Sequence, residues 1–190
     1  WNMFLLGEAR SDVFGGTPFG GEATQGMERF PYNTLNAENP GISGFGDLYQ
    51  NINQMNLFIS RTLHADVLTE SAKNYYLGQV YGLRAYYMYQ LYRSWGDAVF
   101  TEEPSLGFEV GKLAKAATPA AEIFEQVKKD IESSLSYFGP DYTIKEKKSL
   151  WSKAATLMLK ADVYLWSAHR DGGEGDARTA KNALVDIQNN

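Results

Sequence analysis

Cysteine is absent from the 190 residues of this sequence. Its absence excludes disulfide bonds, cysteine nucleophiles and thiolate metal sites, while it leaves the cellular compartment open. Only two histidines are present, His64 and His169, and neither has a second histidine four residues away, as a zinc-binding helix would have. We therefore predict surface or capping roles for both histidines, and we expect no metal and no cofactor.

Clustered positive charge is also missing. The chain has 18 Lys and Arg against 23 Asp and Glu, which gives a net charge of −5 and a pI of about 5.1. This charge excludes a nucleic-acid backbone as a partner, because binding it requires clustered Lys and Arg side chains that replace the released counterions. The short run Lys145, Lys147 and Lys148 is predicted to be a solvated loop.

Long apolar runs are missing too. The most apolar stretch is interrupted by Gln79, Arg84, Gln90 and Arg93, so it lacks the roughly 20 apolar residues of a membrane span. The first residues, Trp1–Leu6, are apolar but carry no charged leader, unlike a signal peptide. We expect the chain to be part of a longer protein, with any targeting signal upstream of Trp1.

The most prominent feature that is present is Tyr75–Gly96, which holds seven of the twelve tyrosines. Apolar residues recur there at steps of three and four, the spacing of a helix face. One face comprises Tyr76, Val80, Leu83, Tyr87, Leu91 and Trp95, and a second comprises Leu77, Ala85, Met88 and Tyr92. The stretch therefore predicts a core helix covered on more than one side. Gly78, Gly82 and Ala85 form a strip of small residues where another helix can approach closely.

Other stretches repeat the helical period. A helix is predicted from Phe45 to Leu63, and a short turn should pair it with the tyrosine-rich helix, which Gly96 would cap. Thr118 is the expected N-cap of the next helix, with Pro119 at its first position and Gly139 at its end. A fourth helix should bury Leu150, Ala154, Leu157, Ala161, Tyr164 and Ala168. A fifth should open at Asp176 and bury Ala177, Ala180, Leu184 and Ile187.

The predicted fold is all-α. A weak internal repeat, in which Leu83-Arg84-Ala85 returns as Leu159-Lys160-Ala161, favours stacked helical hairpins of the tetratricopeptide type. Two long connections, 7–44 and 97–117, lie between the helices, and we expect them to be ordered loops. Residues 1–190 are predicted to form a single helical region.

Three loop segments resemble known chemical sites only superficially. Glu102 and Glu103, with Asp97 nearby, offer the carboxylates that a glycosidase needs, although adjacent loop acids are usually just solvated. Asp171–Asp176 has oxygen ligands suited to calcium but not the EF-hand pattern, so a plain interhelical turn is favoured and an ion site stays open. Gly41–Gly46 has the wrong spacing for a dinucleotide loop.

Loop aromatics have no packing period to satisfy, so they are the better candidates for binding. Phe19, Phe30, Tyr32 and Phe100 lie in the two long loops, and asparagines 33, 36 and 39 follow Tyr32. Rings can stack on sugar faces while amides bond to hydroxyls in a few fixed directions. The predicted ligand-binding residues are Phe30, Tyr32, Asn33 and Asn36, with anchoring of the loop onto the helices as the alternative role.

Four blocks together resemble the SusD/RagB family of outer-membrane nutrient-binding lipoproteins. They occur in the family's order and with similar separations, so that the resemblance extends over about three-quarters of the chain: LYQNINQMNLFI (Leu48–Ile59), LGQVYGLRAYYMYQLYRSWGD (Leu77–Asp97), IFEQVKKDIESSL (Ile123–Leu135) and SLWSKAATLMLKADVYLW (Ser149–Trp166). The resemblance implies a helical scaffold of tetratricopeptide-like pairs that carries functional loops. In relatives that bind starch, a tryptophan precedes the first block with an asparagine three residues later. Here the segment reads RFPYNTLNAENP, without tryptophan, which suggests a different ligand.

The resemblance implies a non-catalytic protein that binds oligosaccharide or peptide nutrients at the cell surface. It also implies delivery to a SusC-like TonB-dependent transporter and a lipid anchor to the outer membrane, outside this sequence. The alternatives are a helical-repeat adaptor for a protein partner and, as the weakest, a glycoside hydrolase acting through Glu102 or Glu103.

Overall fold

The computed structural model describes residues 7–11, 30, 32–36, 38, 44–107 and 114–190. The contacts divide the chain into two compact units, Trp1–Phe45 and Gly46–Asn190, and each is described by itself. The apolar start of the chain, Phe19, Asn39 and residues 41–43 of the glycine-rich segment 41–46 lie outside the described residues.

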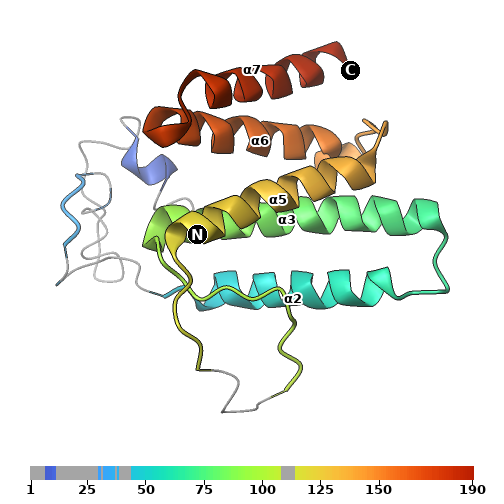
Figure 1. Ribbon diagram of the computed structural model, residues 1–190, viewed down its shortest axis with the longest axis horizontal. Helices are drawn as coiled ribbons and strands as arrows, with labels where there is room; N and C mark the ends of the chain where they lie inside the picture. Colours follow the sequence, from blue (N-terminus) through green and yellow to red (C-terminus); the bar gives the residue numbers. More distant parts are fainter. Residues whose placement is uncertain (1–6, 12–29, 31, 37, 39–43, 108–113) are drawn as a thin grey trace. The chain divides into compact units, whose positions relative to one another are not determined.

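The second unit consists of five helices that run in alternating directions (Figure 1). They are α2 (Gly46–Leu63), α3 (Glu70–Trp95), α5 (Ala120–Phe138), α6 (Lys153–Ser167) and α7 (Gly173–Asn189). Two short turns, η5 (Glu146–Lys148) and the π-helical η6 (Ala168–Gly172), lie on either side of α6. Over the described ranges the only β-type pairing within this unit is the isolated bridge between Ala98 and Thr118. The prediction of an all-α fold is confirmed.

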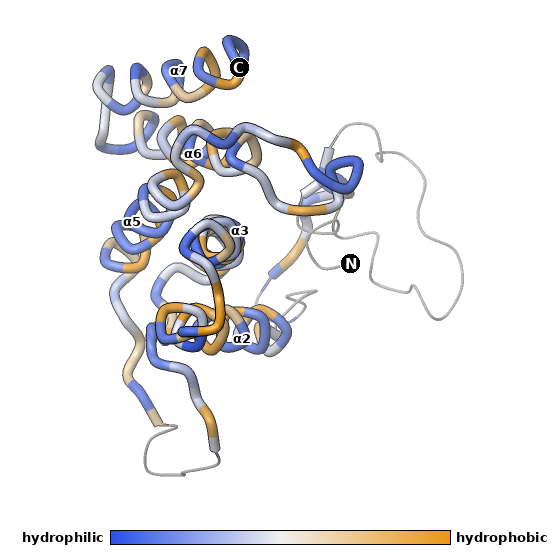
Figure 2. The backbone as a smooth tube through the Cα atoms, turned by 90° about the vertical axis from the view of Figure 1, so that its right-hand side faces the viewer, coloured by the Kyte–Doolittle hydropathy of each residue, from blue (hydrophilic) through white to orange (hydrophobic). Residues whose placement is uncertain are grey.

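Seen end-on, the helices form a stack in which each one packs on the helix before it (Figure 2). α3 lies between α2 and α5, and α6 lies between α5 and α7. Helical hairpins stacked in this way bury on each neighbour the faces that a single hairpin leaves exposed.

Helix α3 is the centre of this stack, as its two apolar faces predict. Its buried residues include Leu77, Ala85, Met88 and Leu91, and most of them belong to the second of the two predicted faces. Tyr76, at the start of the first face, is instead 41% exposed, while Tyr89, on neither predicted face, is fully buried. The buried surface of α3 is therefore rotated about the helix axis relative to the predicted faces, so that it includes Tyr89 and leaves out Tyr76.

The small residues of α3 allow close approach, as expected. Gly78 lies against the ring of Phe138, and Gly82 lies under the indole of Trp151 beside the Thr156 hydroxyl. The Ser134 hydroxyl donates a hydrogen bond of 2.6 Å to the Gly78 carbonyl. Side chains of α5 and of the region where α6 begins thus pack directly on the α3 backbone.

Replacing Gly82 with alanine should lower the free energy of unfolding by about 2 kcal/mol, as overpacking of a close contact does. The new Cβ would overlap with the Trp151 indole, which itself donates to Thr156 Oγ1 at 2.8 Å. Urea unfolding measures the change. Gly175 is the matched control, because its added Cβ would meet no atom within 4 Å, so alanine there should be neutral or stabilising. Equal effects at the two sites would contradict the close-packing interpretation.

The helix ends follow the sequence with one exception. Gly96 and Gly139 end α3 and α5 with φ of 72° and 52°, a left-handed backbone that glycine adopts readily. Thr118, however, is not the N-cap of α5. Its backbone pairs with Ala98, and the carboxylate of Asp97 accepts a hydrogen bond of 2.8 Å from the Ala120 amide. A charged cap from a distant segment replaces the expected local one.

Two predictions about α6 and α7 are also corrected. Leu150 precedes α6 and is 40% exposed, because the helix begins only after Ser152, whose hydroxyl accepts from the Ala155 amide. In α7 the fully buried positions are Ala180 and Ala183, whereas Leu184 is 41% exposed. Small alanines at the contact let α7 lie close to Leu157 and Ala161 of α6. No helix within the described parts of the chain combines the length and apolarity needed to cross a membrane.

Candidate functional site

The segment that contains the predicted ligand-binding residues belongs to the first unit. Phe30 is 2% exposed, whereas Tyr32 is 46% exposed. A turn joins them, in which the Asn33 amide donates to the Phe30 carbonyl at 3.2 Å. Asn33 has a φ of 54°, a left-handed conformation that asparagine tolerates better than most residues. The turn thus buries one ring as an anchor and presents the other to solvent.

The two asparagines of this segment already have local partners. Asn33 Oδ1 accepts a hydrogen bond of 2.7 Å from Arg10 Nε, and Asn36 Oδ1 accepts one of 3.1 Å from the Glu38 amide. Both side chains are exposed, and a side-chain amide both donates and accepts hydrogen bonds. Binding through Phe30, Tyr32, Asn33 and Asn36 stays a prediction, with Tyr32 as the ring that is open for stacking.

The second long loop crosses α2 as a strap, a name used for residues 98–105. Asn53 of α2 holds the end of the strap with two hydrogen bonds, one accepted from the Ser105 amide at 2.7 Å and one donated to the Ser105 carbonyl at 3.2 Å. Asn56, one turn further along, donates to the Thr101 carbonyl at 2.6 Å. These asparagines give the strap a fixed position over α2.

Beneath the strap, a buried polar network joins three helices. Arg84 Nη1 donates to Asn56 Oδ1 at 2.8 Å, and Arg84 Nε and Nη2 donate to the two Asp130 oxygens at 2.7 and 2.8 Å. Arg84 is 2% exposed and Asp130 is 1% exposed. Burial opposes charge on the guanidinium, but the hydrogen bonds to Asp130 outweigh it and raise the pKa of Arg84 above its ordinary value. Burial also raises the pKa of the Asp130 carboxyl, against the lowering effect of Arg84. The network connects α5 through α3 and α2 to the strap.

A mostly apolar cavity of about 340 Å³ lies between α2, α3, α5 and the strap. Its apolar walls include Ile52, Met88, Leu91 and Ile123, and Phe100 of the strap packs on the same core. Phe100, one of the loop aromatics considered for binding, thus has the alternative role of anchoring its loop.

The acidic and histidine candidates have ordinary environments. Asp97 is engaged at the start of α5, and Glu102 and Glu103 are exposed on the strap. His64 Nδ1 donates to the Ser60 carbonyl at the end of α2, and His169 is exposed. Among the residues that the structure places, no three His, Asp or Glu side chains are grouped as metal ligands. Asp171–Asp176 comprises the end of the π-helical turn and the first residues of α7, which begins at Gly173 and not, as predicted, at Asp176.

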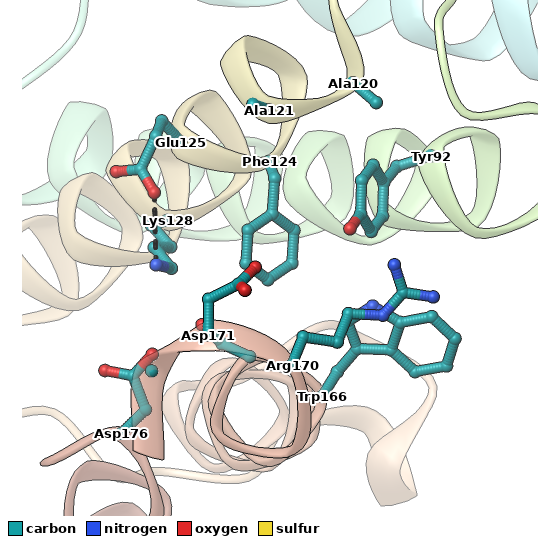
Figure 3. Close-up of a pocket in the computed structure, with 12 residues that line it drawn as sticks. Tyr92, Ala120, Ala121, Phe124, Glu125, Lys128, Trp166, Arg170, Asp171 and Asp176 are labelled. Atoms are coloured by element: carbon teal, nitrogen blue, oxygen red, sulfur yellow. Dashed lines mark hydrogen bonds and ion pairs between the residues drawn. The ribbon is translucent and has the colours of Figure 1, made fainter.

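A second cavity, of about 370 Å³, lies where α3, α5 and α6 meet and is called the aromatic hollow (Figure 3). Rings from three helices line it, Tyr92, Phe124 and Trp166, and charged side chains surround them. The charged lining residues are Glu125, Lys128, Arg170, Asp171 and Asp176. Sequence reasoning missed this site, because the spacing of Tyr92 and Phe124 matches that of core residues.

The rings of the aromatic hollow continue into a buried cluster around Tyr89. Tyr92 and Phe124 lie 4.8 Å apart between ring centroids, and Tyr89 lies 6.4 Å from each of Tyr92, Phe124 and Trp166. Burial raises the pKa of the Tyr89 phenol far above its usual range, so the phenol remains protonated. Tyr89 Oη and Trp166 Nε1 are buried and lack a hydrogen-bond partner within the described structure.

Comparison with known proteins gives consistent matches. B. fragilis NanU is 52% identical and superimposes on the whole chain with a TM-score of 0.88, and a SusD superfamily protein from Bacteroides vulgatus is 49% identical over 98% of it with a TM-score of 0.87. SusD-like protein P38 from Formosa agariphila is 32% identical over 113 residues, 58% of the chain. No family model matches the sequence.

The chain spans only part of each of these proteins. It covers 37% of NanU, 38% of the B. vulgatus protein and 20% of SusD-like protein P38. The similarity to NanU thus extends over this entire chain, but each match covers less than half of the relative.

Proposed function

Since this chain belongs to the SusD superfamily, we propose that it is part of a non-catalytic, cell-surface protein that binds oligosaccharides as nutrients. The observation that carries the proposal is the match to NanU over the entire chain at 52% identity. Other solved SusD-type structures of similar fold are described as a laminarin-binding SusD-like protein and a surface glycan-binding protein from Bacteroides fluxus. Those two are 20% and 23% identical to this chain, so they support the fold rather than a particular glycan.

The turn at Tyr32 is the part of the first unit best suited to this function. An exposed ring stacks on the apolar face of a sugar, and the exposed side-chain amides of Asn33 and Asn36 can bond to its hydroxyls. The fixed turn holds ring and amides in place before a ligand arrives, which reduces the entropy lost on binding. Phe30 contributes indirectly, as the buried anchor of the turn.

Replacing both Tyr32 and Asn36 with alanine should weaken oligosaccharide binding by the full-length protein at least tenfold. Loss of ring contact and of one hydrogen bond accounts for roughly 1.5–3 kcal/mol. Isothermal titration with glycans first identified by array screening measures the effect. Tyr76→Ala is the control, because Tyr76 is 41% exposed and lies on α3. Equal affinity of the double variant and the wild type would exclude the Tyr32 turn as a binding site.

We also propose a SusC-like TonB-dependent transporter as the partner and the outer-membrane surface as the location, both on the strength of family membership. A lipid anchor would lie outside this sequence. Affinity purification of the full-length protein from membranes should recover a transporter of this class. If the full-length protein still bound glycans but was purified without a transporter, the proposed partnership would be contradicted. The proposal of glycan binding would not be affected.

A further inference from the structure

We propose that an exposed side of the α6–α7 pair is the docking surface for a further helix of the full-length protein, one that follows α7 in the chain. The surface is called the α6–α7 face and comprises Met158 and Leu165 of α6 with Ala177 and Leu184 of α7. Its large side chains are well exposed: 55% for Met158, 51% for Leu165 and 41% for Leu184. The proposal concerns the assembly of the protein and does not depend on which ligand the protein binds.

Met158 and Leu184 lie on the same side of the helix pair. The two helices pack on each other through a core cluster that includes Leu157 of α6 and Ala183 of α7. Met158 and Leu184 each follow one of these contact residues by one position, which turns a helix by about 100°. Because α6 and α7 run in opposite directions (Figure 1), this turn leads to the same side of the pair on both helices.

Each helix repeats its apolar position two turns away. Leu165 lies seven residues after Met158, and the exposed Ala177 lies seven residues before Leu184, a spacing that keeps both members of a pair on one helix face. Seven residues span about 10.5 Å of a helix. The face is therefore long enough for an amphipathic helix, which would place apolar side chains along it at steps of three, four and seven residues.

Helix α7 lies at one end of the helix stack of the second unit (Figures 1 and 2). The last unit of a stacked helical array needs a polar outer side to remain soluble, whereas large apolar side chains exposed together mark a contact surface. Each helix of the second unit packs on the helix before it. A further helix that packs on α7 in the same way would cover Leu184 together with Met158 and Leu165 of α6.

The length of the related proteins supports an occupant from the same chain. The sequence spans 37% of NanU and 38% of the Bacteroides vulgatus protein, so the greater part of each lies outside the matched region. Helices that are consecutive in sequence are usually neighbours in space and joined by short connections. A contact within one chain also avoids the translational and rotational entropy that association with a second molecule loses.

Thiol labelling of the full-length protein tests whether the face is covered, because residues 1–190 contain no cysteine that would compete with an introduced one. In the native protein, Leu165→Cys and Leu184→Cys should react with a maleimide more slowly than Asn182→Cys by roughly tenfold or more, since labelling then requires local opening. All three should react alike in urea. Asn182 is the matched control, because it is exposed on α7 and residues two positions apart do not share a helix face. Peptide mapping assigns the label.

Photo-crosslinking identifies the occupant. Benzoylphenylalanine in place of Leu165 should crosslink within one molecule to a peptide that follows residue 190, and the same crosslinker in place of Met158 tests the other end of the face. Labelling of Leu165→Cys and Leu184→Cys as fast as that of Asn182→Cys would overturn the proposal, because the face would be open. A crosslink to a second copy, to another protein or to a peptide before residue 190 would assign the face to a different occupant, and no crosslink from either position would equally contradict the proposal.

Discussion

Replacing Asp130 with alanine should lower the free energy of unfolding by about 3–5 kcal/mol, the range for one partner removed from a buried ion pair. The carboxylate is 1% exposed and accepts both hydrogen bonds from Arg84, which is 2% exposed. Without it, the guanidinium keeps its charge in the core with only Asn56 as a hydrogen-bond partner. Urea denaturation followed by circular dichroism measures the loss.

A second ion pair, between α5 and α6, is the matched control because its acid is largely exposed. Glu132, two residues after Asp130, accepts a bond of 2.7 Å from Lys160, and its side chain is 52% exposed. Glu132→Ala should cost no more than about 1 kcal/mol. The double variant Arg84→Met, Asp130→Leu should recover most of the stability lost in Asp130→Ala, because it removes both charges. A loss in Asp130→Ala no greater than in Glu132→Ala would contradict a buried ionic network.

The two ion pairs also explain the internal repeat. Arg84 and Lys160 occupy equivalent positions in the repeated Leu-Arg/Lys-Ala motif, and each binds an acid on α5. α5 lies between α3 and α6, so it can receive a basic residue from either neighbour. The Arg84–Asp130 pair is more deeply buried than the Lys160–Glu132 pair, because the strap and α2 cover it. The motif was visible in the sequence, but the acidic partners, 46 and 28 residues away, were not.

The helices could be predicted because their signals are local. Period-3.6 spacing indicated each helix and glycines indicated the ends of α3 and α5, since a left-handed backbone favours one residue type. Thr118 failed as a cap because Asp97, from a distant segment, reached the same amide. Contacts of this kind depend on the folded arrangement and leave no periodic trace.

The aromatic hollow could not be predicted for the same reason. Tyr92 and Phe124 have the helical spacing of core residues, and spacing does not tell whether a face meets another helix or a cavity. The decisive feature is the π-helical turn after Ser167, which places Arg170 over the Trp166 ring and Asp171 in the lining of the hollow. The loop residues Tyr32 and Asn36 were selected because a loop lacks a packing period, and their role in binding is still a prediction.

Replacing Asn56 with alanine should lower the free energy of unfolding by about 3 kcal/mol and release the strap. Asn56 is 1% exposed and links two otherwise separate groups, accepting from Arg84 Nη1 and donating to the Thr101 carbonyl. Its loss leaves a charged donor and a backbone acceptor without a partner, and hydrogen bonds to charged groups contribute about 1.5–3 kcal/mol. Urea unfolding measures the loss of stability, and hydrogen exchange measures the mobility of the strap.

Two measurements distinguish the linking role of Asn56 from a simple loss of packing in Asn56→Ala. In Asn56→Ala, amide exchange in residues 98–105 should accelerate more than exchange in α7, because local opening no longer breaks the bond to Thr101. Asn53→Ala is the control for the strap alone, since Asn53 bonds to Ser105 and not to Arg84. It should accelerate exchange near Ser105 while costing only about 1 kcal/mol. If Asn56→Ala and Asn53→Ala lowered the free energy of unfolding equally, the bond between Asn56 and Arg84 would add no stability. The proposed link between the buried network and the strap would then be wrong.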